Sequence, residues 1–307
     1  MPVIRHELFQ RIFNSPLMMH PGKAQAGLEG MGGRVVDEQL VIVSEGTSLD
    51  HVAGRNTLVA GALGDPLGAR YDAARRAPYA MIGNVAIIPI EGTLVHKGAY
   101  VGASSGLTSY QGIITQVNRV RQDPKVAGVV FEVDSFGGEV DGAFGTAAII
   151  AQLSSEKPTI AILTENACSA AYLLASAARQ IVMPETGTAG SIGVITMHTD
   201  VSKALKKEGV KVTIITAGAR KADGNPLGPL PDEVQSRMQE QVEKTRVIFA
   251  RVVGQYRGKR FTAAQALATE AATFDGRDAC LIGMVDAVAF PATAFEAFER
   301  EMRGRRA

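Results

Sequence analysis

The segment VAGVVFEVDSFGG, residues 126–138, decides the fold. It opens with a Val-rich run, Val126–Val133, and after Asp-Ser-Phe it ends in the glycine pair Gly137 and Gly138. A short, nearly continuous apolar run predicts a strand that is buried on both faces, which is typical of parallel sheets between helices. The glycine pair predicts a sharp turn at the carboxyl end of that strand.

Similar runs occur on both sides of this segment, with helical patterns between them. The other predicted strands are 84–90, 159–164, 192–197 and 210–216. The predicted helices are 109–122, 139–154, 169–179, 201–208 and 231–256, followed by short segments to residue 288. Short strands that alternate with longer helices predict repeated βαβ units, and therefore an α/β fold with a mainly parallel sheet.

Local composition and hydrophobic pattern divide the chain into three zones. Residues 1–78 mix short apolar stretches with Gly, Ala, Asp and Arg, and we interpret them as a partly helical N-terminal arm. Residues 79–290 carry the strand and helix pattern and form the predicted domain. Residues 291–307 are a predicted C-terminal tail with one helix and a basic end, which is typical of a solvated helix terminus.

Composition excludes several classes of protein. The 307 residues carry a net charge of +1, so no overall charge attracts nucleic acid or an anionic membrane. Two cysteines without a CxxC or His/Cys cluster argue against disulfides and metal sites, and no cofactor is indicated. Arg11, Asn14 and Pro16 interrupt the apolar residues at the N-terminus, so no signal peptide is expected. We therefore expect a soluble, cytoplasmic protein with no membrane segment.

The small-residue segment NACSAAYLLASAA, residues 166–178, follows a predicted strand and opens a helix at Ser169. Unpaired backbone N–H groups and the positive helix end would face that hydroxyl, which suits a nucleophile. The N–H of Ala170 would be one oxyanion donor, and Gly137 or Gly138 a second. The competing interpretations are that the small residues only permit close helix packing and that the glycines are only a turn.

A base for Ser169 is harder to place. His198, at a predicted strand end, is the one tempting histidine, but no third partner and no G-x-S-x-G elbow accompany it, so we interpret it as structural. Cys168 is interpreted as a small buried hydrophobe. Lys221, in the loop GARKADGNP, could serve if burial favoured its neutral amine. The alternative is that Lys221 is an ordinary solvated lysine. The five histidines are His6, His20, His51, His96 and His198.

Five segments in this order resemble the signal peptide peptidase A family of serine peptidases, across about residues 85–290. They are VAIIPIEGTL, VFEVDSFGGEV, ACSAAYLLASAA, GTAGSIGVITMH and TAGARKADGNP. The resemblance implies a crotonase/Clp-protease-like fold. It also implies Ser169 as nucleophile, Lys221 as general base, Ser191 as the residue that orients the lysine, and an oxyanion hole made by Gly137 or Gly138 with Ala170. Phe136 departs from the family's usual proline, which should change turn stiffness more than chemistry.

The segments IFNSPLMMHPGKAQA, GLTSYQGII and KADGNPLGPLPDEVQ resemble the phage branch of that family, the capsid assembly or head maturation proteases. That resemblance implies protein substrates such as scaffold, portal or the chain itself. It also implies a homo-oligomer in which the serine and the lysine can come from neighbouring subunits. No nucleic acid or membrane partner is implied.

Other functions remain open at this point. A signal-peptide-peptidase-like protease with a bacterial role would use the same residues. An acyl-CoA enzyme would use the DSFGG turn to polarise a thioester, with Glu139 or Asp141 as acid, but would leave Ser169 and Lys221 without a role. A non-catalytic capsid or scaffold component would keep only the fold.

Overall fold

The computed structural model describes residues 16–19, 66–98, 101–104 and 106–304. Most of the predicted N-terminal arm therefore lies outside the described residues. The strands are β1 Leu17–Met19, β2 Ala80–Ile82, β3 Val85–Val95, β4 Ala103–Ser104, β5 Leu107–Ser109, β6 Gly128–Glu139, β7 Thr159–Cys168, β8 Gln180–Met183, β9 Thr188–Gly190, β10 Thr273–Asp275 and β11 Ala287–Val288. The helices are α3 Pro66–Ala73, α4 Tyr110–Gln122, α5 Ala143–Glu156, α6 Ala170–Ser176, α7 Ser202–Lys207, α8 Asp232–Arg257, the 3-10 turn η2 Gly258–Arg260, α9 Ala263–Ala268, α10 Gly276–Leu281 and α11 Pro291–Arg303.

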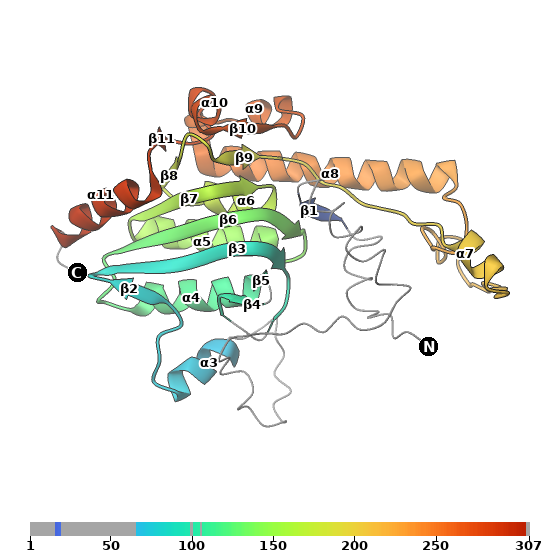
Figure 1. Ribbon diagram of the computed structural model, residues 1–307, viewed down its shortest axis with the longest axis horizontal. Coiled ribbons are helices and arrows are strands. Elements are labelled where there is room, and N and C mark those ends of the chain that lie inside the picture. Colours follow the sequence, from blue (N-terminus) through green and yellow to red (C-terminus); the bar gives the residue numbers. More distant parts are fainter. Residues whose placement is uncertain (1–15, 20–65, 99–100, 105, 305–307) are drawn as a thin grey trace.

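One mixed sheet organises these elements (Figure 1). Its main path has the strand order β10-β9-β7-β6-β3-β5-β4, and the central strands β3, β6 and β7 are parallel to one another. The chain passes through α4 between β3 and β6, and through α5 between β6 and β7. These crossovers confirm the predicted βαβ units and the α/β class with a mainly parallel sheet.

Both faces of the central strands are buried, as the apolar runs predicted. Phe131 and Leu163 belong to a large core that also includes apolar residues of α4, α5, α6 and α8. Val130 and Ile162 point to the opposite face, where Phe298 of α11 packs on them. Successive residues of a strand point to opposite faces, so a strand covered on both sides must be apolar throughout.

The other main elements follow the sequence pattern closely. The predicted strands 84–90, 126–133 and 159–164 are confirmed as β3, β6 and β7, and each continues past its predicted end. The predicted helix at 109–122 is confirmed as α4, where the Ser109 side chain accepts a hydrogen bond from the Gly112 N–H. The long predicted helix 231–256 is confirmed as α8.

Three local predictions were wrong. Residues 192–197 and 210–216 form no strand; the first segment makes one isolated antiparallel bridge, Leu17 to Ile195, and the second is extended and exposed. A strand forms only where a neighbouring strand offers hydrogen-bond partners, and none of the described strands pairs with 210–216. The side chains of this segment therefore stay in solvent, and Ile215 is 92% exposed. The glycine pair is not a turn either, because β6 continues through Gly137 and Gly138 to Glu139.

The C-terminal segment folds back onto the domain. The helix predicted there is confirmed as α11, and its buried residues Ala294, Phe298 and Met302 pack against the sheet. Gly128 lies beneath it, because an added Cβ at that position would come within 2.6 Å of the Met302 sulfur. Within the part of the chain that the structure describes, no helix has the length and apolar character needed to span a membrane.

Candidate active site

Ser169 stands at a strained turn between a strand and a helix. It follows β7 directly and is the N-cap of α6, with φ 57° and ψ −120°. A residue with a side chain seldom adopts positive φ, and such strain persists where the surrounding structure holds it in place. Here the Ser169 N–H donates to the Gly190 carbonyl at 2.8 Å, and the Ser169 carbonyl accepts from Leu173 N–H at 3.0 Å.

The Ser169 side chain is fully buried, and its hydroxyl donates to the carbonyl oxygen of Gly193 at 3.4 Å. The bond is long for an O–H donor, so the hydroxyl is only weakly held. Within the described residues, no lysine or histidine makes a hydrogen bond to Ser169. Within the single chain, the Ser169 hydroxyl thus has only a backbone carbonyl as its hydrogen-bond partner.

Gly137 packs against this serine from the end of β6. Its φ is 97°, and an added Cβ would lie 3.0 Å from the Ser169 Cβ and 2.1 Å from the Met18 carbonyl oxygen. The carboxyl ends of β6 and β7 therefore meet at Ser169, where parallel α/β sheets commonly bind their ligands. No side chain larger than hydrogen fits between Ser169 and Met18.

The predicted oxyanion donors, Gly137, Gly138 and Ala170, have different surroundings in the structure. The Gly137 N–H donates to Ser135 Oγ at 3.1 Å, and that hydroxyl in turn donates to the Gly92 carbonyl at 2.6 Å. Ala170 is the first residue of α6, so its N–H has no acceptor within the helix. Gly138 has β3 close on one side, since an added Cβ would lie 1.8 Å from the Leu94 carbonyl oxygen.

Ser191 lies next to Gly190, whose carbonyl accepts from the Ser169 N–H. It follows β9, whose residue Gly190 pairs with Cys168, and its N–H donates to the Ala272 carbonyl at 2.9 Å. Like Ser169, it is buried and has a positive φ, 53°. The structure thus brings Ser169, Ser191 and Gly137 together around the ends of β6, β7 and β9.

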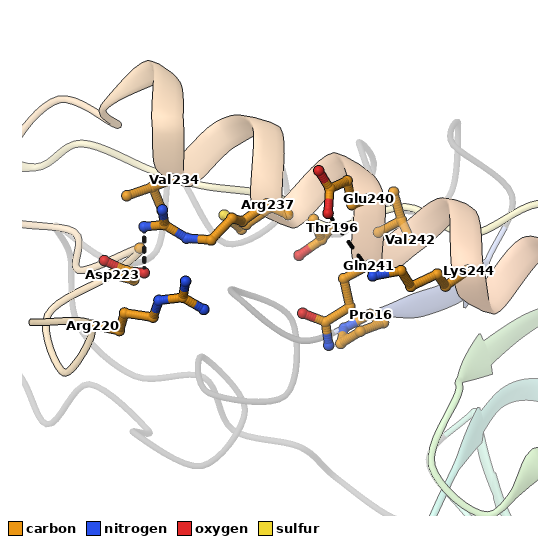
Figure 2. A pocket seen from close by; sticks show the side chains of 12 residues that line it. Pro16, Thr196, Arg220, Asp223, Val234, Arg237, Glu240, Gln241, Val242 and Lys244 are labelled. Atoms are coloured by element: carbon orange, nitrogen blue, oxygen red, sulfur yellow. Dashed lines mark hydrogen bonds and ion pairs between the residues drawn. The ribbon is translucent and has the colours of Figure 1, made fainter.

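Lys221 is not part of this cluster within one chain. It is exposed and lies in a turn whose backbone bond joins Lys221 N–H to the Gly218 carbonyl at 3.1 Å. Figure 2 shows the neighbouring residues Arg220 and Asp223 facing α8, where Asp223 pairs with Arg237 at 2.8 Å. Within one chain Lys221 is therefore a solvated loop lysine, the alternative that the sequence left open.

The length of α8 separates the two predicted partners. The part of α8 that shares a core with α6 is Phe249, Ala250 and Val253. An α-helix rises about 1.5 Å per residue, so Arg237 and Ala250 are about 20 Å apart along α8. In Figure 1 the chain from β9 runs along α8 to α7, at the end of the helix that projects from the sheet.

His198, Cys168 and Glu139 were the alternative candidates for catalytic residues, and the structure gives each of them surroundings that fit a structural role. His198 Nε2 donates to the Asn225 carbonyl at 2.9 Å. This bond joins the segment between β9 and α7 to the loop that carries Lys221. Burial raises the pKa of the Cys168 thiol to about 12, so it stays protonated at neutral pH. Glu139 ends β6 rather than opening α5, and its carboxylate accepts from the His96 backbone N–H at 2.6 Å.

Sequence reasoning missed β1 and Gly193. β1 pairs antiparallel with the end of β6, with Met18 opposite Gly138 and Met19 opposite Gly137. Its other edge bonds Ile195, with N–H to O distances of 2.8 and 2.9 Å. Three apolar residues after Pro16 are too short a run to predict a strand, and a backbone acceptor such as Gly193 leaves no side-chain signal.

Comparison with known proteins finds one matching family model and two similar phage proteins. The model of Peptidase family S49 matches residues 151–303, a range that includes Ser169, Ser191 and Lys221. Capsid assembly protease C of Escherichia phage lambda is 36% identical over 89% of this chain. Head-tail preconnector protein GP5 of Enterobacteria phage P21 is 34% identical over 89% of this chain. The chain spans 61% and 53% of the lengths of these two relatives.

Among solved structures, an enoyl-CoA hydratase/isomerase family member aligns with a TM-score of 0.43 and 17% identity, covering 74% of this chain and 75% of that one. The resemblance seen in the sequence, including its phage branch, is confirmed by the family model and by the two phage relatives. The chain belongs to peptidase family S49.

Proposed function

We propose that this chain is a serine endopeptidase of phage capsid assembly, with Ser169 as nucleophile and Lys221 as general base. The observation that carries the proposal is the conformation of Ser169. A serine with φ 57° and ψ −120°, held between a parallel strand and a helix at the carboxyl edge of the sheet, is strained in the way of an activated nucleophile. A serine needed only for helix packing requires no such strain.

The reaction follows from these groups. Ser169 Oγ attacks the carbonyl carbon of the scissile peptide, and the neutral Lys221 amine takes the hydroxyl proton. The oxygen of the tetrahedral intermediate gains a negative charge, which the Ala170 N–H and a glycine of the Gly137–Gly138 pair stabilise. Collapse breaks the C–N bond, the leaving amine takes the proton from Lys221, and water then hydrolyses the acyl-enzyme by the same proton path.

Lys221 reaches Ser169 from a neighbouring subunit in this proposal. Its turn is exposed in the single chain, and the adjoining segment 210–216 presents Val210, Val212, Ile214 and Ile215 to solvent. Apolar side chains along an extended segment are typical of an interaction surface. Packing of this segment and turn on a second subunit would remove the amine from water and favour its neutral form.

The proposed substrates are proteins of the assembling phage head, such as scaffold, portal or the chain itself. Support comes from the relatives, which are a capsid assembly protease and a head-tail preconnector protein. The acyl-CoA alternative finds less support, because the Glu139 carboxylate bonds the His96 N–H and the strained residue is a serine.

Two experiments test the proposal. Wild-type protein, Ser169→Ala and Lys221→Ala are incubated with casein and with a phage scaffold protein; only wild type should cleave. The two inactive variants are then dissociated, mixed equally and reassembled. If the serine comes from one subunit and the lysine from the next, each of the two is intact at half of the sites in the mixture. About a quarter of the sites then have both, and about a quarter of the wild-type rate should return.

The control mixture pairs Ser169→Ala with the Ser169→Ala/Lys221→Ala double variant, which cannot form an intact pair. Full activity in Ser169→Ala would show that the proposed nucleophile is wrong. A mixture of the single variants no more active than the control would exclude a dyad shared between subunits.

A further inference from the structure

β1 fills a slot directly beside the nucleophile. In Figure 1 it is the short blue strand against the ends of β6 and of the chain that leaves β9. One of its edges pairs antiparallel with Gly137–Glu139, and the other exchanges two hydrogen bonds with Ile195. The slot therefore offers main-chain donors and acceptors on both sides, which is how proteins bind an added extended strand.

The centre of β1 approaches the reacting atoms. The Met18 carbonyl oxygen and the Ser169 Cβ both flank Gly137, at 2.1 Å and 3.0 Å from the position that a Cβ would occupy there. A peptide in this slot thus presents a backbone carbonyl to the serine. The Met18 side chain is fully buried in the main core, so the slot also holds an apolar pocket for one side chain.

We propose that Leu17–Met19 occupies the peptide-binding cleft of the Ser169 site as a built-in substrate mimic, which must leave before a substrate strand can bind. The inference rests on the proposed peptidase function. It also defines the substrate: an extended segment, antiparallel to β6, with an unbranched apolar side chain such as Met where Met18 lies. Met adapts to irregular pockets, which suits this position.

The cleft continues beyond the start of β1. A pocket of about 480 Å³ is lined at one end by Pro16, Thr196 and Gln241, and farther along by Arg237 of α8 (Figure 2). Substrate residues that precede the buried apolar side chain would run into this pocket. Its polar and charged lining, which includes Arg220 and Asp223, favours polar residues there.

A reversible crosslink tests the inference in the full chain. Leu17 and Ile195 exchange both N–H···O bonds, and Cα atoms of such antiparallel pairs are about 5.5 Å apart, within the range that a disulfide spans. In Leu17→Cys/Ile195→Cys, oxidation would fix β1 in the cleft. Cys168 is buried with a raised thiol pKa, so it exchanges poorly with the new pair.

The assay is casein cleavage by the oxidised and the reduced double variant. We expect oxidation to lower the rate at least tenfold and a reductant to restore it, while each single-cysteine variant is indifferent to oxidation. Equal rates in the two states would overturn the inference.

Met18→Glu provides a second, independent variant. A carboxylate is poorly tolerated in an apolar pocket, so β1 should leave the cleft and casein cleavage should rise several-fold over wild type and over the Met18→Leu control. An unchanged or lower rate in folded Met18→Glu would contradict the mimic.

Labelling of Ser169 by a fluorophosphonate separates the two proposals. Folded Met18→Glu protein that is neither labelled at Ser169 nor able to cleave casein would overturn the peptidase function, and the mimic with it. A labelled protein whose locked and reduced forms cleave equally would overturn the mimic alone.

Discussion

Replacing Gly138 by Ala should destabilise the fold at the active site. Gly138 lies in β6, and an added Cβ would come 1.8 Å from the Leu94 carbonyl oxygen, 2.6 Å from its carbon and 2.7 Å from its nitrogen. All three atoms are backbone of the neighbouring strand β3, so no side chain can rotate away to make room. Leu94 itself is fully buried, and β3 therefore has little freedom to move.

The magnitude follows from that crowding. Adding a methylene to a well-packed core costs about 1–3 kcal/mol, and a clash with central backbone belongs at the top of that range. We therefore expect Gly138→Ala to lose about 3 kcal/mol of unfolding free energy. Because the strand must shift where it meets Ser169, casein cleavage should fall as well, by at least tenfold.

Urea unfolding followed by circular dichroism measures the change. The matched control is Gly145→Ala in α5, where an added Cβ meets nothing within 4 Å. There alanine should stabilise the helix by about 0.5–1 kcal/mol, because glycine is the poorer helix former. We therefore expect the unfolding free energy to fall in Gly138→Ala and to rise in Gly145→Ala. A Gly138→Ala protein as stable as wild type would refute the reasoning about the β3–β6 contact.

Two other substitutions give distinct signatures. Ser191→Ala should lower the casein cleavage rate less than Ser169→Ala does and leave the urea midpoint nearly unchanged; complete loss of cleavage would instead make Ser191 indispensable. Asp286→Asn should cost about 3–5 kcal/mol, because it breaks the ion pair with the buried Arg257. Burial acts to raise the pKa of Asp286, but hydrogen bonding and charge from Arg257 outweigh it and hold that pKa below its usual value. The carboxylate thus stabilises the fold above about pH 4 and loses this effect as pH falls toward its lowered pKa. Urea midpoints at several acidic pH values should show this loss in wild type and a flatter profile in Asp286→Asn.

Local chemistry was enough to predict the centre of this fold. The apolar runs of β3, β6 and β7 must be buried on both faces. A parallel sheet covered by the helices that alternate with these strands meets that requirement. The position of Ser169 after β7 was likewise readable, since small residues follow an apolar strand there. Its positive φ was not, because backbone strain leaves no mark on composition.

The errors share one physical cause, which is that partners decide the structure of an extended segment. Residues 210–216 have the β-branched composition of a strand, but no described edge receives them. β1 has little strand signal of its own, and it forms because β6 and Ile195 leave a slot between them. The sequence left open whether Lys221 is buried or solvated, and its exposure follows from the same lack of a partner for residues 210–216.

The two proposals together describe an enzyme that is inactive as a single chain. Ser169 is held in its strained conformation in advance, so the nucleophile needs no rearrangement. The proposed base, Lys221, is exposed and lies outside the Ser169 cluster, and the cleft holds the chain's own strand. Assembly would supply the lysine from a neighbour, and release of β1 would admit the substrate. Because the two steps use different contacts, the crosslinked variant should assemble normally and yet remain inactive, whereas Lys221→Ala should open its cleft and still fail to cleave.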